Sequence, residues 1–253
     1  MNWFYDMAGL TEQEFWILAG IVVAAGIVRG FSGFALSALI MATAIIILPP
    51  VELIPMLWWL EMSASLMMMK GGWADADRKT AYGLVIGGAL GWPFGLWLTT
   101  SLDVDTSKAI ALTIIVVLAA LQLTKIRLPF LATTPGLYGS GVVSGIVSGL
   151  ASVGGMIVAL YVLASDASAR SMRGTLVLYL FLSSIMSMVI MLSFGVMTTT
   201  SITRGLIFAL PTMFGVFLGQ QLFVERFAAY YRPFCLVLLC SLAGAGLVRT
   251  VLA

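Results

Sequence analysis

The chain has 253 residues, of which 61% are hydrophobic and only 9% are charged, and its formal net charge is +2. Soluble domains contain roughly 25% charged residues, so this composition excludes a soluble protein with an ordinary surface. Successive apolar stretches of about 20 residues are typical of an all-α polytopic membrane protein. No basic patch for nucleic acid is present. The chain also has no histidine, and we expect no metal, no cofactor and no enzymatic activity.

The first apolar run is too long for one straight span. It extends from Phe15 to Leu48, after an acidic N-terminus (residues 1–14) that has no Lys or Arg and that we place outside the cytoplasm. A helix of 34 residues would be roughly 51 Å long, whereas the hydrocarbon core of a bilayer is about 30 Å thick. The run must tilt, project or fold back, and the predicted break is Arg29–Gly33.

Three ordinary spans follow this run, which ends at Pro49-Pro50. They are predicted at about Val51–Met69, Ala81–Thr100 and Ser107–Thr124. The loop Lys70–Thr80 is the most polar part of the chain. We predict that residues 15–124 form a first membrane repeat and that residues 125–135 form a cytoplasmic linker.

The second half, residues 136–253, repeats this order. Gly136–Ala164 is again overlong, about 44 Å as a straight helix, and its predicted break spans Ser148–Gly155. Ordinary spans follow at about Gly174–Phe194, Ile202–Leu222 and Pro233–Val251. In this alignment Ser32–Ala35 corresponds to Ser148–Ala151.

The positive-inside rule favours folding both overlong segments as hairpins that enter and leave on one side. With the N-terminus outside, nine basic residues are then cytoplasmic, whereas only Lys108, Arg204 and Arg249 are outside. A first segment that crosses once, with the N-terminus inside, gives the same split. Two hairpins would give each half an odd number of crossings. The second half would then be inverted relative to the first, and both chain ends would lie outside.

The two broken segments resemble those of the TauE/SafE (sulfite exporter, TSUP) family of bacterial membrane proteins. The resemblance rests on GIVRGFSGFALSALI (Gly26–Ile40) and GVVSGIVSGLASVGG (Gly141–Gly155), each of which opens a four-segment half. It covers essentially the whole chain. It implies a multi-pass secondary transporter of the bacterial inner membrane that exports sulfite or a small organosulfonate such as sulfoacetate. An anion channel of similar inverted-repeat architecture is the alternative.

The broken segments would enclose a small anion near the middle of the membrane. Helix N-termini carry unpaired N–H groups and a partial positive charge, and so bind anions. A guanidinium group would add a fork suited to oxyanions. The predicted substrate-binding residues are Arg29, Gly30, Ser32, Gly33, Ser37 and Ser63 in the first half, and Ser148, Gly149, Ser152, Gly154, Gly155 and Ser183 in the second. Glu61 is the candidate for proton coupling, since charged groups inside membranes tend to be functional.

These residues also have structural interpretations. Arg29 and Glu61 could form a structural ion pair, the glycines could serve close helix packing, and serines in membrane helices often bond to their own i−4 carbonyl. We expect the tryptophans, Trp92 among them, to face lipid or the membrane interface. The expected partners are a small anion, lipid and protons, with a second copy of the chain as a candidate.

Overall fold

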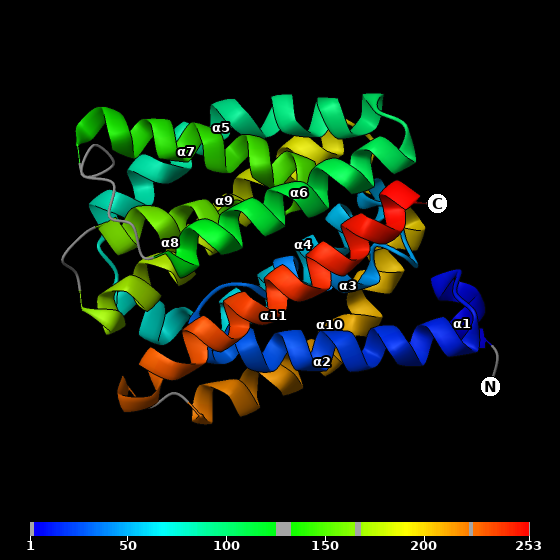
Figure 1. Ribbon diagram of the computed structural model, residues 1–253, viewed down its shortest axis with the longest axis horizontal. Helices are drawn as coiled ribbons and strands as arrows, with labels where there is room; N and C mark the ends of the chain where they lie inside the picture. The colour runs from blue at the N-terminus through cyan, green and yellow to red at the C-terminus, as the bar shows by residue number, and fades with distance from the viewer. Residues whose placement is uncertain (1–2, 125–132, 165–167, 223–224, 253) are drawn as a thin grey trace.

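The computed structural model describes residues 3–124, 133–164, 168–222 and 225–252, and this part of the chain is a bundle of α-helices without strands (Figure 1). Both chain ends lie at the same end of the bundle. The helices are α1 (Trp3–Ala8), α2 (Glu12–Ser32), α3 (Leu36–Ala44), α4 (Pro50–Asp75), α5 (Arg78–Ser101), α6 (Val104–Leu123), α7 (Thr134–Ala151), α8 (Gly154–Ala164), α9 (Ala169–Ser193), α10 (Thr199–Gln221) and α11 (Glu225–Leu252). Five of them, α2, α5, α6, α9 and α10, contain a stretch long and apolar enough to cross a membrane.

The first overlong segment breaks into α2 and α3 because of its local backbone chemistry. Thr11 begins α2 with a capping box, in which its hydroxyl accepts from the Glu14 N–H and the Glu14 carboxylate accepts from the Thr11 N–H. Gly33 ends the helix with φ of 82°, the left-handed conformation that glycine adopts at helix C-termini. Ala35 is also left-handed, with φ of 75°. Two left-handed residues so close together cannot continue a helix, so the chain turns back.

The segment α2–α3 enters and leaves at one end of the bundle. Arg204 at the start of α10 donates to the carbonyl of Ala8 and pairs with Glu52 at the start of α4, with an Nη1–Oε2 distance of 2.5 Å. The starts of α2, α4 and α10 therefore lie together, and we call this the terminal end. The C-terminal end of α2 lies at the opposite end, where Gly33 contacts Arg173 near the start of α9.

The segment α7–α8 enters and leaves at the opposite end. Leu137 in the first turn of α7 packs against Gly83 near the start of α5, and the Thr175 hydroxyl of α9 accepts from the N–H of Asp77, the N-cap of α5. Ser152 then ends α7 with φ of 57°. The Ser144 hydroxyl donates to the carbonyl of Gly154 at 2.7 Å, so α8 folds back beside α7. The two broken segments thus point into the bundle from opposite ends.

Glycines allow two pairs of parallel helices to pack backbone to backbone. A Cβ at Gly26 of α2 would lie 2.6 Å from the Thr212 carbonyl oxygen of α10. A Cβ at Gly30 would overlap the Val216 carbonyl oxygen of the same helix. On α5, a Cβ at Gly91 would overlap the Val142 carbonyl oxygen of α7. These close approaches have the small-residue packing of membrane helices. They fix the first helix of each broken segment against a helix of the other half of the chain.

The predicted spans are confirmed in type and order, but three local predictions are wrong. The first break lies at residues 33–35, so Arg29 and Ser32 are still helical. The second break lies at residues 152–153, within the predicted range Ser148–Gly155, while Ser148 and Gly149 remain in α7. The predicted alignment of Ser32–Ala35 with Ser148–Ala151 is also wrong: measured from the left-handed residue that ends each helix, Gly33 corresponds to Ser152, and Arg29 to Ser148. The predicted polar loop 70–80 is mostly helical, since only Ala76 and Asp77 separate α4 from α5. Residues 125–132 of the predicted linker lie outside the described residues.

Candidate functional site

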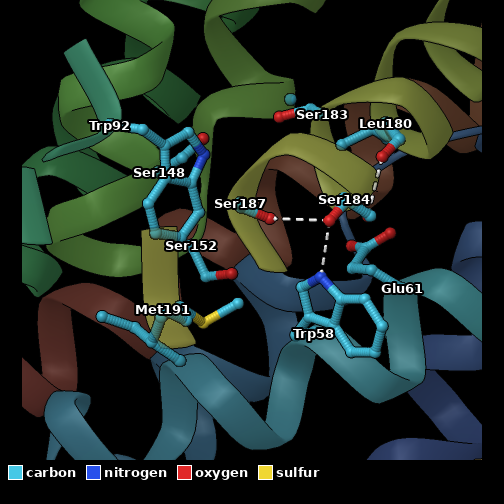
Figure 2. Close-up of a pocket in the computed structure, with 12 residues that line it drawn as sticks. Trp58, Glu61, Trp92, Ser148, Ser152, Leu180, Ser183, Ser184, Ser187 and Met191 are labelled. Carbon is cyan, nitrogen blue, oxygen red and sulfur yellow. Dashed lines mark hydrogen bonds between the residues drawn. The ribbon is translucent and has the colours of Figure 1, made fainter. Parts of the chain in front are cut away.

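A cavity of about 40 Å³ lies between the second broken segment and helices α4, α5 and α9 (Figure 2). Its lining carries one carboxylate, five hydroxyls and two indole rings. These polar side chains are Glu61, Ser148, Ser152, Ser183, Ser184, Ser187, Trp58 and Trp92. The cavity extends toward the terminal end, where Ile54 near the start of α4 and Met191 near the end of α9 line it.

A smaller void of about 10 Å³ lies between this cavity and the first broken segment, and it is lined by Ala35, Ser37, Ala38, Glu61, Ser152, Val153, Gly155, Met156 and Leu180. Glu61, Ser152, Gly155 and Leu180 line both voids. The smaller void has room for about one water molecule. The structure therefore brings the two breaks together around Glu61.

The carboxylate of Glu61 lies at the N-terminus of α3. Its Oε1 accepts from the Ser37 hydroxyl at 2.7 Å and from the Ser37 backbone N–H at 3.3 Å. Ser37 is the second residue of α3, so this N–H is one of those left unpaired at a helix start. A carboxylate at this position is stabilised by hydrogen bonding and by the helix dipole. The anion position predicted at the start of α3 is thus occupied by a side chain of the protein itself.

Arg29 lies behind Glu61 and does not line either void. Its side chain is completely buried, its Nη2 lies 3.4 Å from Glu61 Oε2, and the same Nη2 donates to the Ser65 hydroxyl at 2.9 Å. Its Nη1 donates to the carbonyl of Gly33. An isolated charge in so apolar a place would be very unfavourable, so the ion pair and these hydrogen bonds explain how Arg29 is accommodated.

A second arginine, Arg173 of α9, also binds the C-terminal end of α2. It donates to the carbonyl of Gly30 at 2.7 Å, and a Cβ at Gly33 would lie 2.8 Å from its Cγ. Cations at helix C-termini bond the last carbonyls and interact favourably with the dipole. Arg29 and Arg173 together therefore hold the break between α2 and α3 in place from two sides. Arg173 is not among the predicted site residues, and the available signal was its basic side chain just after the second broken segment.

Several of the serine hydroxyls around the cavity have partners within the protein. Ser184 donates to the Leu180 carbonyl at 2.8 Å, and Ser187 donates to the Ser184 carbonyl at 3.1 Å. Ser148 and Ser183 interact with the hydroxyl of Tyr179. Tyr179 itself is buried and lies 2.7 Å from the Ser144 hydroxyl.

The two tryptophans of the lining differ in their hydrogen bonds. Trp58 Nε1 donates to the Ser184 carbonyl at 2.7 Å, whereas Trp92 Nε1 is buried and has no hydrogen-bond partner among the described residues. The expectation that Trp92 faces lipid or the interface is wrong, because only 4% of it is exposed. A signal was available: Trp92 lies four residues after Gly88 and three before Gly95, beside the glycines through which α5 packs closely on α7.

The predicted site residues divide into two groups. Those that line one of the two voids are Ser37, Glu61, Ser148, Ser152, Gly155 and Ser183. Those that line neither are Arg29, Gly30, Ser32, Gly33, Ser63, Gly149 and Gly154. The second group serves the backbone: Ser32 and Ser63 donate to carbonyls of their own segments, and the glycines lie at close approaches to neighbouring chain.

Comparison with known proteins identifies the family. A family model described as "Sulfite exporter TauE/SafE" matches residues 18–246, which include both broken segments and the whole cavity. No curated protein and no solved structure matches the chain. Since the family model covers most of the sequence, the chain belongs to the TauE/SafE family of membrane transporters.

Proposed function

We propose that the protein carries a small oxyanion, sulfite or a small organosulfonate, through the cavity between its two broken segments, and that a proton on Glu61 accompanies the anion. The family supports sulfite-type anions as substrates. The observation that carries the proposal is the place of Glu61. Its carboxylate occupies the helix N-terminus at the edge of the cavity, where a substrate anion would otherwise bind.

Two negative charges so close together would repel each other strongly in a site of low dielectric. An entering anion would therefore favour the protonated form of Glu61. Protonation also weakens the hold of Ser37 on the carboxyl group, so the hydroxyl and backbone N–H of Ser37 become available to the substrate. Anion and proton would then bind together and move together. This arrangement gives Arg29 an indirect role, as the partner that balances the charge of Glu61 when no substrate is bound.

The opposed broken segments suggest how the site could be reached from the two sides in turn. The segments enter from opposite ends and meet at Glu61, which is the geometry expected of inverted repeats. In secondary transporters such repeats rock around a central site. We propose this relationship for residues 15–124 and 136–253, with the terminal end outside the cytoplasm. A channel remains the alternative, and its flux would not saturate with substrate.

Flux into proteoliposomes tests the proposal. Isethionate and sulfoacetate are suitable probes, because a sulfonate stays ionised and cannot cross the bilayer as a neutral acid. We expect saturable uptake that an inward-directed proton gradient stimulates. Glu61→Gln should abolish this stimulation while some flux remains. Glu52→Gln is the matched control, since Glu52 lies on the same helix but pairs with Arg204 at the terminal end. Equal proton stimulation in Glu61→Gln and wild type would contradict the coupling role.

A further inference from the structure

We propose that the indole N–H of Trp92 is a direct hydrogen-bond donor to the transported oxyanion and determines selectivity for it. This inference rests on the proposed function, because it assigns a ligand to the same cavity. It adds a residue outside the hairpins, on α5, to the predicted site.

The hydrogen-bonding state of Trp92 points to a missing partner. An indole N–H can only donate, and a buried tryptophan normally has an acceptor for it. Leaving a buried donor unpaired is unfavourable. Trp92 is 4% exposed, its Nε1 has no hydrogen bond among the described residues, and the side chain lines the cavity. An oxyanion in the cavity would supply the acceptor.

The neighbouring donors strengthen this assignment. Ser184 and Ser187 give their protons to carbonyls of α9, and the Trp58 N–H is paired with the Ser184 carbonyl. Among the described residues that line the cavity, Trp92 is the one whose buried side-chain donor has no hydrogen-bond partner in the protein. In Figure 2 Trp92 lies on the side of Ser148 and Ser152, and Glu61 lies across the cavity. An anion held by Trp92 would thus face the Glu61 carboxylate across the cavity, as the proposed proton coupling requires.

The backbone of Trp92 is held rigidly, as a selective donor requires. A Cβ at Gly145 of α7 would lie 2.9 Å from the Trp92 backbone nitrogen, and one at Gly149 would lie 2.7 Å from its carbonyl oxygen. The helix α5 therefore lies in close backbone contact with α7 on both sides of this residue. Little reorganisation would be needed to donate to a bound oxygen, and preorganised donors bind more strongly for this reason.

Charged groups near the cavity are arranged consistently with a neutral donor. Glu61 of α4 is the charged residue of the lining, and Arg29 of α2 lies behind it at 3.4 Å. Arg173 of α9 is at the end of α2, and Arg204 of α10 pairs with Glu52 at the terminal end. Trp92 would bind the anion without adding charge, so selectivity would depend on oxygen acceptors in the right place. Sulfonate oxygens meet this requirement, whereas a spherical halide ion does so less well.

The test compares Trp92→Phe with Trp59→Phe in the purified full-length protein. Trp59 Nε1 is also buried without a partner, but Trp59 packs against Gly205 of α10 and does not line the cavity. We expect Trp92→Phe to weaken isethionate binding about 10- to 100-fold, the range for a hydrogen bond to a charged group, with chloride binding changed much less. Trp59→Phe should bind isethionate like the wild type.

Indole ¹H–¹⁵N NMR of the wild type gives a readout that does not depend on a stable variant. Isethionate should move one of the indole N–H signals downfield, and this signal should be absent from Trp92→Phe. The inference is overturned if wild type binds isethionate but no indole signal moves, or if Trp92→Phe binds equally well. If wild type binds no sulfonate or sulfite at all, the proposed function fails as well, so the two failures are distinguishable.

Discussion

Ser37 donates both its hydroxyl and its backbone N–H to one carboxylate oxygen of Glu61, at 2.7 and 3.3 Å, and so ties the start of α3 to the middle of α4. These bonds connect a returning half-helix to a membrane-spanning helix at the point where both voids meet. If the first broken segment moves, it must therefore either break the Ser37–Glu61 hydrogen bonds or move together with α4.

Ser37→Ala should destabilise the protein by about 1.5 to 3 kcal/mol, because it removes a buried hydrogen bond to a charged group. The free energy of unfolding in a denaturing-detergent titration measures the effect. Ser63→Ala is the control: the Ser63 hydroxyl donates at 2.9 Å to the Leu60 carbonyl of its own helix, so its loss should change stability little. A change as small in Ser37→Ala as in the control would show that the Ser37–Glu61 bond does not hold the two helices together.

Arg29→Met should cost about 3 to 5 kcal/mol of stability, because it leaves the buried Glu61 carboxylate without its positive partner. The second substitution Glu61→Gln in that background should restore much of the loss, since it removes the unpaired charge. The four proteins form a double-mutant cycle, and their unfolding free energies give the coupling between the two residues. Additive effects would mean that the 3.4 Å contact contributes little. Transport by the double variant should no longer respond to a proton gradient.

The sequence predicts the helices well because their signals are local. Hydropathy and the thickness of a bilayer locate the spans, and the length of each overlong run reveals a break. The position of each break is less certain, because it depends on which residue adopts the left-handed conformation. Gly33 does so in the first segment, whereas in the second it is Ser152 rather than a nearby glycine. Nothing in the residue types alone favours Ser152 over Gly149 or Gly154.

The site was only partly predictable because its contacts join distant parts of the chain. Arg29 and Gly33 are four residues apart, so the hydrogen bond from the Arg29 side chain to the Gly33 carbonyl at the end of its own helix was foreseeable. That the carboxylate of Glu61 would occupy the start of α3 depends instead on how α4 packs beside the hairpin. The burial of Trp92 depends in the same way on the contact of α5 with α7. Hydropathy cannot distinguish a tryptophan that faces lipid from one that lines a cavity between helices.

Gly30→Ala should destabilise the protein strongly, whereas Gly20→Ala on the same helix should not. A Cβ at Gly30 would overlap the Val216 carbonyl oxygen of α10, but a Cβ at Gly20 meets nothing within 4 Å. Overpacking of this kind typically costs about 1 to 3 kcal/mol, while alanine favours the helix at the open position. Thermal unfolding in detergent distinguishes the two variants. If both melt like wild type, α2 and α10 are not in backbone contact.

Thiol labelling in intact cells should show that the two ends of the bundle lie on opposite sides of the membrane. In a background with Cys235 and Cys240 replaced by alanine, a membrane-impermeant maleimide should label Asp105→Cys at the start of α6 without permeabilisation. Lys79→Cys at the start of α5 should react only after the membrane is permeabilised. Both wild-type side chains are exposed, so access to the reagent decides the result.

The expected sidedness follows from the positive-inside rule, because Lys70, Arg78 and Lys79 lie together where α4 ends and α5 begins. Reversed labelling would agree with the fold but contradict the predicted orientation in the membrane. Labelling of both cysteines from outside would show that α5 does not cross the membrane once.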